Sequence, residues 1–215
     1  MTATTVTGQP TPQRQLENGY LIRPATRDDV GAARSVMLDT VYHDLRSGYV
    51  PRWHADIIDI EGAYLDPPRH ILLVAERDGQ VVATGGVRSH GPKHPPNPAW
   101  IAQRYPSGST AQLCRIYVRA EHRRQGLARA LVTTLLDFAA ATEGYDTVYL
   151  HTDPASPGAE AFWRATARLV CDERELPERQ EVVHFEIPLP GRQPAPLPET
   201  AAATQPATLS TRSDR

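Results

Sequence analysis

The chain has 215 residues, enough for one domain with its own core, and 23 Lys and Arg against 25 Asp and Glu give a net charge of -2. This balance excludes the basic footprint of a general nucleic-acid-binding or anionic-membrane-binding protein, and no run of about 18 apolar residues is present to cross a membrane. Residues 1–15 lack the apolar segment of a secretory signal, and the two cysteines have no framework spacing, so we expect a cytoplasmic location.

Both ends of the chain have the composition of disordered tails. Residues 1–17 are rich in Thr, Gln and Pro, and residues 188–215 are dominated by Pro, Ala, Thr and Ser without periodicity. Such segments bury too little apolar surface to offset the entropy of the chain. We therefore expect a single folded domain over residues 18–187.

The folded part alternates strand and helix patterns. In chain order they predict a strand at 20–23, helices at 26–41 and 53–64, strands at 71–76 and 81–87, a loop at 89–109, a strand at 113–118, a helix from 127, a strand at 147–151, a helix at 159–167 and a last strand at 181–187. Thr26 with Asp29 resembles a capping box at the first helix start. Asp78-Gly79 between the second and third strands predicts a hairpin.

The segment from residue 113 to residue 129 carries the strongest chemical signal. An apolar strand leads through a charged turn into Gly126, which opens an amphipathic helix. Unpaired N–H groups and the helix dipole favour an anion at such a helix start, and Gly126 with Ala128 keeps the loop clear for a phosphate. Three arginines can reach further phosphate oxygens: Arg123, Arg124 and Arg129. We interpret the segment as a pyrophosphate cradle.

This loop matches neither the Walker A pattern nor the Rossmann fingerprint. Arg123-x-x-Gly126-x-Ala128 instead resembles the acetyl-CoA motif of the GCN5-related N-acetyltransferase (GNAT) superfamily, which is Gln or Arg, two residues, Gly, one residue, then Gly or Ala. The element order is similar to that family over residues 19–187. The resemblance implies the α/β GNAT acyl-CoA N-acyltransferase fold, a mixed, mostly antiparallel sheet with helices on both faces. It also implies these residues for acetyl-CoA: Ile116, Tyr117, Val118, Arg123, Arg124, Gln125, Gly126, Leu127, Ala128, Arg129 and Trp163.

The resemblance further implies that an amine attacks the acetyl thioester directly, while a main-chain N–H of the strand at 114–118 polarises the thioester carbonyl. Two positions depart from the family pattern, because Gln112 replaces a common glutamate base and Trp163 replaces a common tyrosine acid. His151, at a strand end, is our candidate base, since neutral imidazole accepts protons near pH 7; a water chain or an ordinary structural histidine are the alternatives. Tyr149 or Tyr117 could protonate the thiolate in place of the family tyrosine, or the thiolate could leave to water. Trp163 could also simply pack.

The acceptor site should lie between the first two helices and the long loop, where aromatic and imidazole side chains gather: Tyr42, Tyr49, Trp53 and His90. Charges of both signs occur there, as an amino-acid-like acceptor would use. The His90-x3-His94 spacing lacks a third metal ligand, so we expect no metal. Cys114 lies inside an apolar strand and is more typical of a buried side chain than of a nucleophile.

Together these patterns predict a cytoplasmic acetyl-CoA-dependent N-acetyltransferase that acetylates the primary amine of a small molecule in a ternary complex. The acceptors we consider are an amino acid, a polyamine or an amine-bearing natural product. A protein N-terminus or lysine is the alternative within the class, and a non-catalytic acyl-CoA sensor is the alternative outside it. We expect no nucleic-acid or membrane partner, and the resemblance is compatible with a homodimer because family members are often dimers.

Overall fold

The computed structural model describes residues 12–177 and 180–192. These residues form one eight-stranded sheet in the order β1-β2-β3-β4-β5-β6-β8-β7. Its strands are β1 (Arg14–Gln15), β2 (Leu21–Pro24), β3 (Ile71–Arg77), β4 (Gln80–Arg88), β5 (Thr110–Val118), β6 (Thr147–Thr152), β7 (Arg168–Asp172) and β8 (Val183–Ile187). Every neighbouring pair is antiparallel except β5 and β6, which confirms the predicted mixed, mostly antiparallel sheet.

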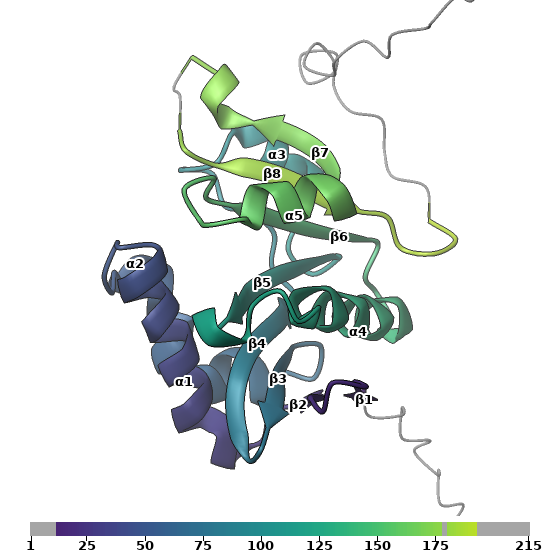
Figure 1. The fold of residues 1–215 in the computed structure, drawn as a ribbon. Coiled ribbons are helices and arrows are strands. Elements are labelled where there is room, and N and C mark those ends of the chain that lie inside the picture. The colour runs from purple at the N-terminus through teal and green to yellow at the C-terminus, as the bar shows by residue number, and fades with distance from the viewer. Residues whose placement is uncertain (1–11, 178–179, 193–215) are drawn as a thin grey trace, which may run out of the picture.

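Helices cover both faces of this sheet, as predicted (Figure 1). The α-helices are α1 (Val30–Asp39), α2 (Pro51–Ile58), α3 (Ala99–Arg104), α4 (Leu127–Ala141) and α5 (Ala159–Thr166). Two π-helical turns, η2 (Thr40–Asp44) and η3 (Glu61–Leu65), follow α1 and α2, and three 3-10 turns complete the elements: η1 (Arg27–Asp29), η4 (Ala120–His122) and η5 (Glu173–Glu175). One core cluster packs under α4 and α5, and a second packs under α1, α2 and η3.

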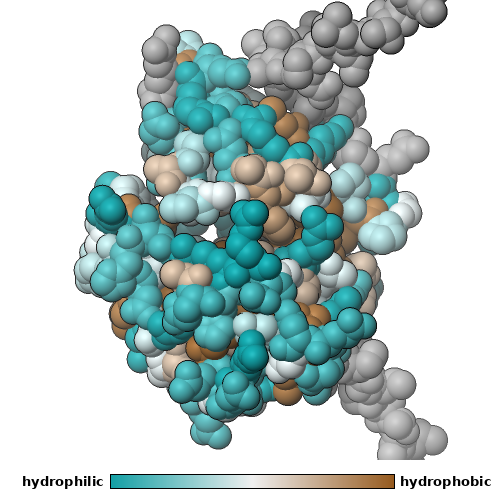
Figure 2. Space-filling view, in the orientation of Figure 1, coloured by the Kyte–Doolittle hydropathy of each residue, from teal (hydrophilic) through white to brown (hydrophobic). Residues whose placement is uncertain are grey.

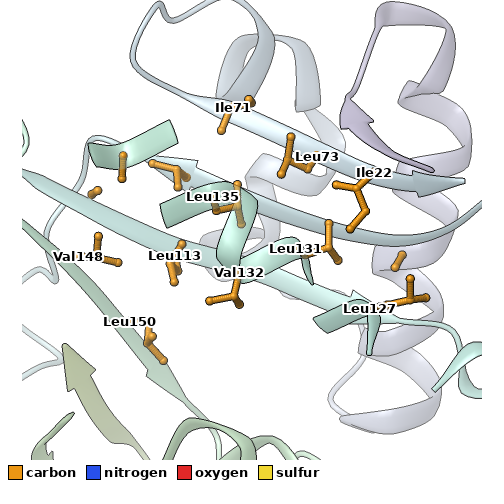
Figure 3. Packing of buried hydrophobic residues seen from close by; sticks show 14 of the residues in the cluster. Ile22, Ile71, Leu73, Leu113, Leu127, Leu131, Val132, Leu135, Val148 and Leu150 are labelled. Carbon is orange, nitrogen blue, oxygen red and sulfur yellow. The ribbon is translucent and has the colours of Figure 1, made fainter. Parts of the chain in front are cut away.

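The apolar face of α4 anchors the larger core cluster (Figure 3). Leu127, Leu131 and Leu135 are buried one turn apart and point towards the sheet. Burying each such side chain stabilises the fold by about 1.5–3 kcal/mol. The helix that follows the predicted cradle is therefore fixed against β4 and β5, and the loop at its start is held in one place.

Two local signals read from the sequence are confirmed. The Asp29 carboxylate accepts from the Thr26 N–H at 2.7 Å in a capping box, and bidentate hydrogen bonds from Arg23 lower the pKa of Asp29 to about 2. The β3–β4 hairpin turns through Asp78 and Gly79, both in the left-handed region, with Arg77 paired to Gln80.

Other predicted elements differ from the structure. The expected helix at 53–64 is divided, because the Asp59 carboxylate accepts the Gly62 N–H at 3.0 Å and ends α2 before η3 begins. The expected loop at 89–109 contains α3. The sequence patterns missed β1 and β7, which lie at the two edges of the sheet.

The folded region extends past both predicted boundaries. Arg14 and Gln15, inside the predicted N-terminal tail, pair with β2, and Leu189, inside the predicted C-terminal tail, is buried in the core under α4. Strand pairing at the N-terminal side and a buried leucine at the C-terminal side hold these residues to the domain, and composition alone does not indicate either contact. The rest of the predicted tails, residues 1–11 and 193–215, lies outside the described residues.

The parallel strands β5 and β6 separate after three pairs. Thr110 pairs with Thr147, Ala111 with Val148, and Gln112 with Tyr149. Beyond Gln112, β5 continues to Val118 and β6 to Thr152 with no further pair between them in the described chain. We call the part where these two strands are not paired with each other, residues 113–118 and 150–152, the β5–β6 wedge. Along it β5 stays paired with β4, and β6 stays paired with β8. It leaves the β6-facing backbone edge of β5 without a strand partner in the described chain, where an extended ligand can pair.

Candidate active site

The loop between β5 and α4 has the open geometry expected of an anion cradle. Gly126 is the N-cap of α4 at φ 79°, and Arg124 two residues earlier is also left-handed at φ 64°. A Cβ added to Gly126 would meet no atom within 4 Å. No side chain of the described residues caps the helix, so its first N–H groups and the positive end of its dipole face this open space. The loop therefore fits a pyrophosphate.

The predicted cradle residues divide into two kinds. Arg124, Gln125 and Arg129 are exposed, and Figure 2 shows strongly hydrophilic side chains gathered over the start of α4. Arg123 is engaged elsewhere, because its Nε donates to the Val118 carbonyl at 3.0 Å and its Nη2 pairs with Asp44 of η2. The Leu127 side chain is buried in the core, so Leu127 can offer a ligand only its backbone.

A β-bulge reshapes β5 beside the wedge. Thr84 pairs with Tyr117 while Gly86 pairs with Cys114, so β5 holds one more residue than β4 between these pairs. Arg115 takes the strained conformation at φ 55°, and Thr84 Oγ1 donates to the Arg115 carbonyl at 2.9 Å. Bulges of this kind re-aim a side chain and interrupt pairing. Here the bulge directs Arg115 towards α2.

Arg115 forms a buried ion pair with Asp56 of α2. Its Nε and Nη2 donate to the two Asp56 oxygens at 2.9 and 2.6 Å. The Tyr64 hydroxyl also donates a hydrogen bond to Asp56, at 2.5 Å. The Asp56 and Arg115 side chains are 6% and 14% exposed. Burial alone would raise the pKa of Asp56, but the hydrogen bonds from Arg115 hold it below its usual value. Asp56 is thus an ionised carboxylate whose charge is already paired with Arg115.

Cys114, next to the bulge, is held as a thiol. Its Sγ lies 3.4 Å from the Tyr64 hydroxyl and 3.7 Å from the Gly86 carbonyl. Burial raises the pKa of the Cys114 thiol. Because the thiolate is the nucleophilic form, this environment disfavours a covalent route through Cys114.

The candidate base and acid on β6 occupy different environments. His151 lies two residues beyond the last β5–β6 pair, is exposed, and has its ring beside those of Tyr149 and His184. Desolvation by these surroundings, with a smaller effect of the Arg115 charge, lowers the pKa of His151 to about 4. Tyr149 is 0% exposed, and its hydroxyl lies 2.7 Å from Nδ1 of His184. Gln112, half-buried, pairs with Tyr149 on one side and Arg88 on the other.

Trp163 packs in the core. It is 6% exposed and meets the Phe162 ring edge-on, with 4.8 Å between the ring centroids. It belongs to the cluster under α4 and α5. These contacts support the alternative that Trp163 is a packing residue. No contact of the described residues favours a role for Trp163 in binding acetyl-CoA.

The predicted acceptor residues fall into two groups. Tyr42, Tyr49 and Trp53 come from one segment between η2 and α2, where Tyr42 and Trp53 are exposed and Tyr49 is half-buried. Arg115 donates to the Trp53 carbonyl at 2.6 Å, which places this segment beside the bulge. His90 lies apart from it, in the loop after β4.

Around the predicted residue His90 the structure brings together the Arg88 guanidinium and the His70 imidazole. The His70 and His90 rings lie 5.3 Å apart, and burial, together with the Arg88 charge, lowers the pKa of each imidazole. Arg88 Nε and His90 Nδ1 are buried without a hydrogen-bond partner in the described chain. Arg88 Nη1 is 3.9 Å from Asp56, which is already bound by Arg115. The Arg88 Nε–H is an unsatisfied donor in the described chain, which suits an anion.

Two negative findings apply to residues 12–177 and 180–192 only. These residues contain no group of three or more His, Cys, Asp or Glu side chains that could hold a metal ion. No helix among them has the length and apolar character needed to cross a membrane.

Comparison with known proteins adds the family to this geometry. The model of the acetyltransferase (GNAT) family matches residues 38–166, which include the wedge and the cradle. The chain belongs to the GNAT family. Among solved structures, GNAT-family acetyltransferases from Staphylococcus aureus Mu50 and Streptococcus agalactiae 2603 superpose with TM-scores of 0.61 and 0.58 at 15% and 17% identity, each over 80% of this chain and 99% of that chain. At these identities they show the GNAT fold alone.

Several curated GNAT-like relatives are more similar in sequence. N-acetyltransferase 8 of Rattus norvegicus is 34% identical over 143 residues, which is 64% of this chain and 59% of that protein. N-acetylaspartate synthetase of Homo sapiens is 30% identical over 112 residues, which is 52% of this chain and 32% of that protein. The chain thus spans less than two thirds of the length of the curated relatives it matches.

Proposed function

We propose that this GNAT protein transfers the acetyl group of acetyl-CoA directly to the primary amine of a small molecule in a ternary complex. The observation that carries the proposal is the open, left-handed Gly126 loop at the end of β5, whose β6-facing edge has no strand partner along the wedge in the described chain. Arg124, Arg129 and the first N–H groups of α4 would hold the pyrophosphate. The β6-facing backbone edge of residues 113–118 would hold the pantetheine arm.

Acetyl-CoA supplies an activated thioester. The chain must supply a base for the amine, an acid for the thiolate and hydrogen-bond donors for the developing oxyanion. A main-chain N–H at the bulge can stabilise the developing oxyanion without any particular side chain. His151 is neutral at pH 7 and lies at the wedge, so its free ring nitrogen can accept a proton from the amine. Gln112 pairs with Tyr149, two residues before His151. Its amide can orient the amine but cannot take its proton.

For the thiolate, the geometry favours Tyr117 over Tyr149 as proton donor. Tyr117 is half-buried, and its hydroxyl accepts from Arg115 Nη1 at 3.2 Å, which leaves its own proton available. The Tyr149 hydroxyl is buried and bonded to His184, and desolvation raises its pKa well above the usual value.

The charges near the wedge support an acceptor that carries an anionic group beside its amine. Arg88 pairs in register with Gln112, the last β5 residue before the wedge, so its cationic group lies one strand away. The neighbouring anion Asp56 is bound by Arg115 and does not neutralise it fully. Among the relatives, the name N-acetylaspartate synthetase states an amino-acid acceptor for that protein. We therefore place amino-acid-like amines first and polyamines after them.

The test is acetyl transfer to matched pairs of amines, each pair an amino acid and its decarboxylated counterpart. We expect the carboxylate-bearing member to be preferred, and Arg88→Gln to raise its KM while acetyl-CoA affinity is unchanged. Arg192→Gln, at an exposed ion pair with Asp146, is the control. Transfer only to polypeptide amines would support the alternative within the class, and acetyl-CoA binding without transfer to any amine would support the sensor.

A further inference from the structure

Four polar side chains form a continuous hydrogen-bonded chain from the wedge into the interior. His151 Nδ1 lies 3.4 Å from the Tyr149 hydroxyl, which lies 2.7 Å from His184 Nδ1. His184 Nε2 lies 2.5 Å from Oε1 of Glu173. The residues come from β6, from β8 beside it (Figure 1) and from η5. Only His151 is exposed, since Tyr149 and His184 are 0% and Glu173 is 3% exposed.

The hydrogen-bond directions follow from the chemistry of the groups. An ionised Glu173 only accepts, so His184 must carry its proton on Nε2, and its Nδ1 must accept from Tyr149. The Tyr149 oxygen then accepts from Nδ1–H of His151. A neutral imidazole has one N–H group, so Nε2 of His151 is left with a free lone pair.

The same contacts fit a second state that holds one more proton. If Glu173 is protonated, it donates to His184 Nε2, His184 Nδ1–H donates to Tyr149, and Tyr149 donates to His151 Nδ1. Nε2 of His151 then carries the hydrogen. The two states differ by one proton: it enters at His151 Nε2, and the shift along the chain leaves one proton on Glu173, with every intermediate group neutral in both.

We propose that this chain is a proton relay in which Tyr149, His184 and Glu173 act through His151 to deprotonate the acceptor ammonium. The proposal rests on the proposed acetyl transfer. One proton passes from the ammonium nitrogen to His151 Nε2, and the protons on His151 Nδ1, Tyr149 and His184 Nε2 each move one place towards Glu173. An ammonium and a carboxylate become an amine and a carboxylic acid. After the product leaves, the protons move back and His151 Nε2 releases one to water.

The relay explains how a weak base can serve this reaction. Desolvation lowers the pKa of His151 to about 4 and that of His184 to about 3, so neither imidazole retains the charge. Burial likewise disfavours ionised Tyr149. The titratable and charged groups facing the chain include Arg115 near His151, Tyr105 and Cys171 near Tyr149, and Asp172 near His184. The 3.4 Å step is long, as catalytic hydrogen bonds often are before substrate binds.

The test compares two isosteric changes at stacked tyrosines. Tyr149→Phe removes the central hydroxyl of the relay, whereas Tyr105→Phe removes the hydroxyl of an equally buried ring, 4.7 Å away, that bonds to Glu186. We expect Tyr149→Phe to lower kcat roughly 100-fold, within the range of general acid–base catalysis, with the KM for acetyl-CoA unchanged. Glu173→Gln should show the same pattern, and Tyr105→Phe should retain kcat.

A second readout needs no turnover. In the protein without acetyl-CoA, nitrogen-15 NMR should find His151 protonated on Nδ1, and Tyr149→Phe should abolish that fixed tautomer while Tyr105→Phe preserves it. Equal kcat values in the two tyrosine variants, or His151 protonated on Nε2 in the wild-type protein, would overturn the relay and leave acetyl transfer standing. Wild-type protein that transfers no acetyl group to any amine would instead overturn the proposed function.

Discussion

Replacing Asp56 by Asn should destabilise the protein strongly, because it isolates a buried charge. The change keeps the volume of the side chain but leaves the Arg115 guanidinium, 14% exposed, without its carboxylate. Breaking a buried pair in this way costs about 3–5 kcal/mol. For a domain of this size, each kcal/mol lowers Tm by roughly 2–4 °C, so we expect a loss of roughly 6–20 °C.

Urea unfolding of the full chain measures this cost, with Glu61→Gln as the matched control. Glu61 pairs with Arg27 on the surface, where the side chains are 46% and 64% exposed, and such pairs contribute about 0–1 kcal/mol. A double variant, Asp56→Leu with Arg115→Met, should recover most of the lost free energy, because it removes both charges. Equal unfolding midpoints for Asp56→Asn and Glu61→Gln would refute the reasoning.

The same pair predicts a pH dependence of stability. The folded-state pKa of Asp56 is held below its ordinary value of 3.8. The contribution of the pair is therefore complete above that ordinary value and is lost as the pH falls towards the lower, folded-state value. The difference in unfolding free energy between wild type and Asp56→Asn should narrow below about pH 4. A difference that stays constant into strong acid would contradict the ionised pair.

Three further substitutions separate binding, packing and catalysis. Gly126→Val should fill the cradle and lower the affinity for acetyl-CoA, measured by calorimetry, more than tenfold. The control Gly79→Val changes a glycine that is also left-handed, at φ 75°, but lies in the hairpin turn, and it should bind acetyl-CoA normally. Equal affinities of the two variants would show that the cofactor is misplaced. Trp163→Ala should cost about 3–5 kcal/mol in urea unfolding, and a negligible loss would argue against its core role. His151→Ala should reduce kcat roughly 10²–10⁴-fold in steady-state assays with acetyl-CoA affinity retained; unchanged kcat would remove His151 from the mechanism.

Much of the fold was predictable because it rests on local patterns. The strands at 71–76 and 81–87 combine apolar runs with an Asp-Gly turn, and both φ values of that turn are positive in the structure. The helix after Gly126 repeats leucine at helical spacing, and that face is buried. The strands β1 and β7 were missed because they are edge strands, whose formation depends on pairing with a single neighbour.

The candidate site was predictable only where backbone geometry carries the chemistry. The Gly126 loop follows from local spacing, and the structure keeps it open. The buried pair between Asp56 and Arg115 depends on a bulge and on a contact across 59 positions. The relay likewise joins β6 to β8 and η5. One signal was available, since His184 interrupts an apolar strand between Val183 and Phe185, where a polar side chain needs a buried partner.

The most direct test of the central claim is thiol release from acetyl-CoA by the wild-type chain across a panel of small amines, with the mass of each product recorded. We predict release of thiol with an amino-acid-like amine, together with a product heavier by one acetyl group on its amine. Tight binding of acetyl-CoA without thiol release for any small amine would contradict the account.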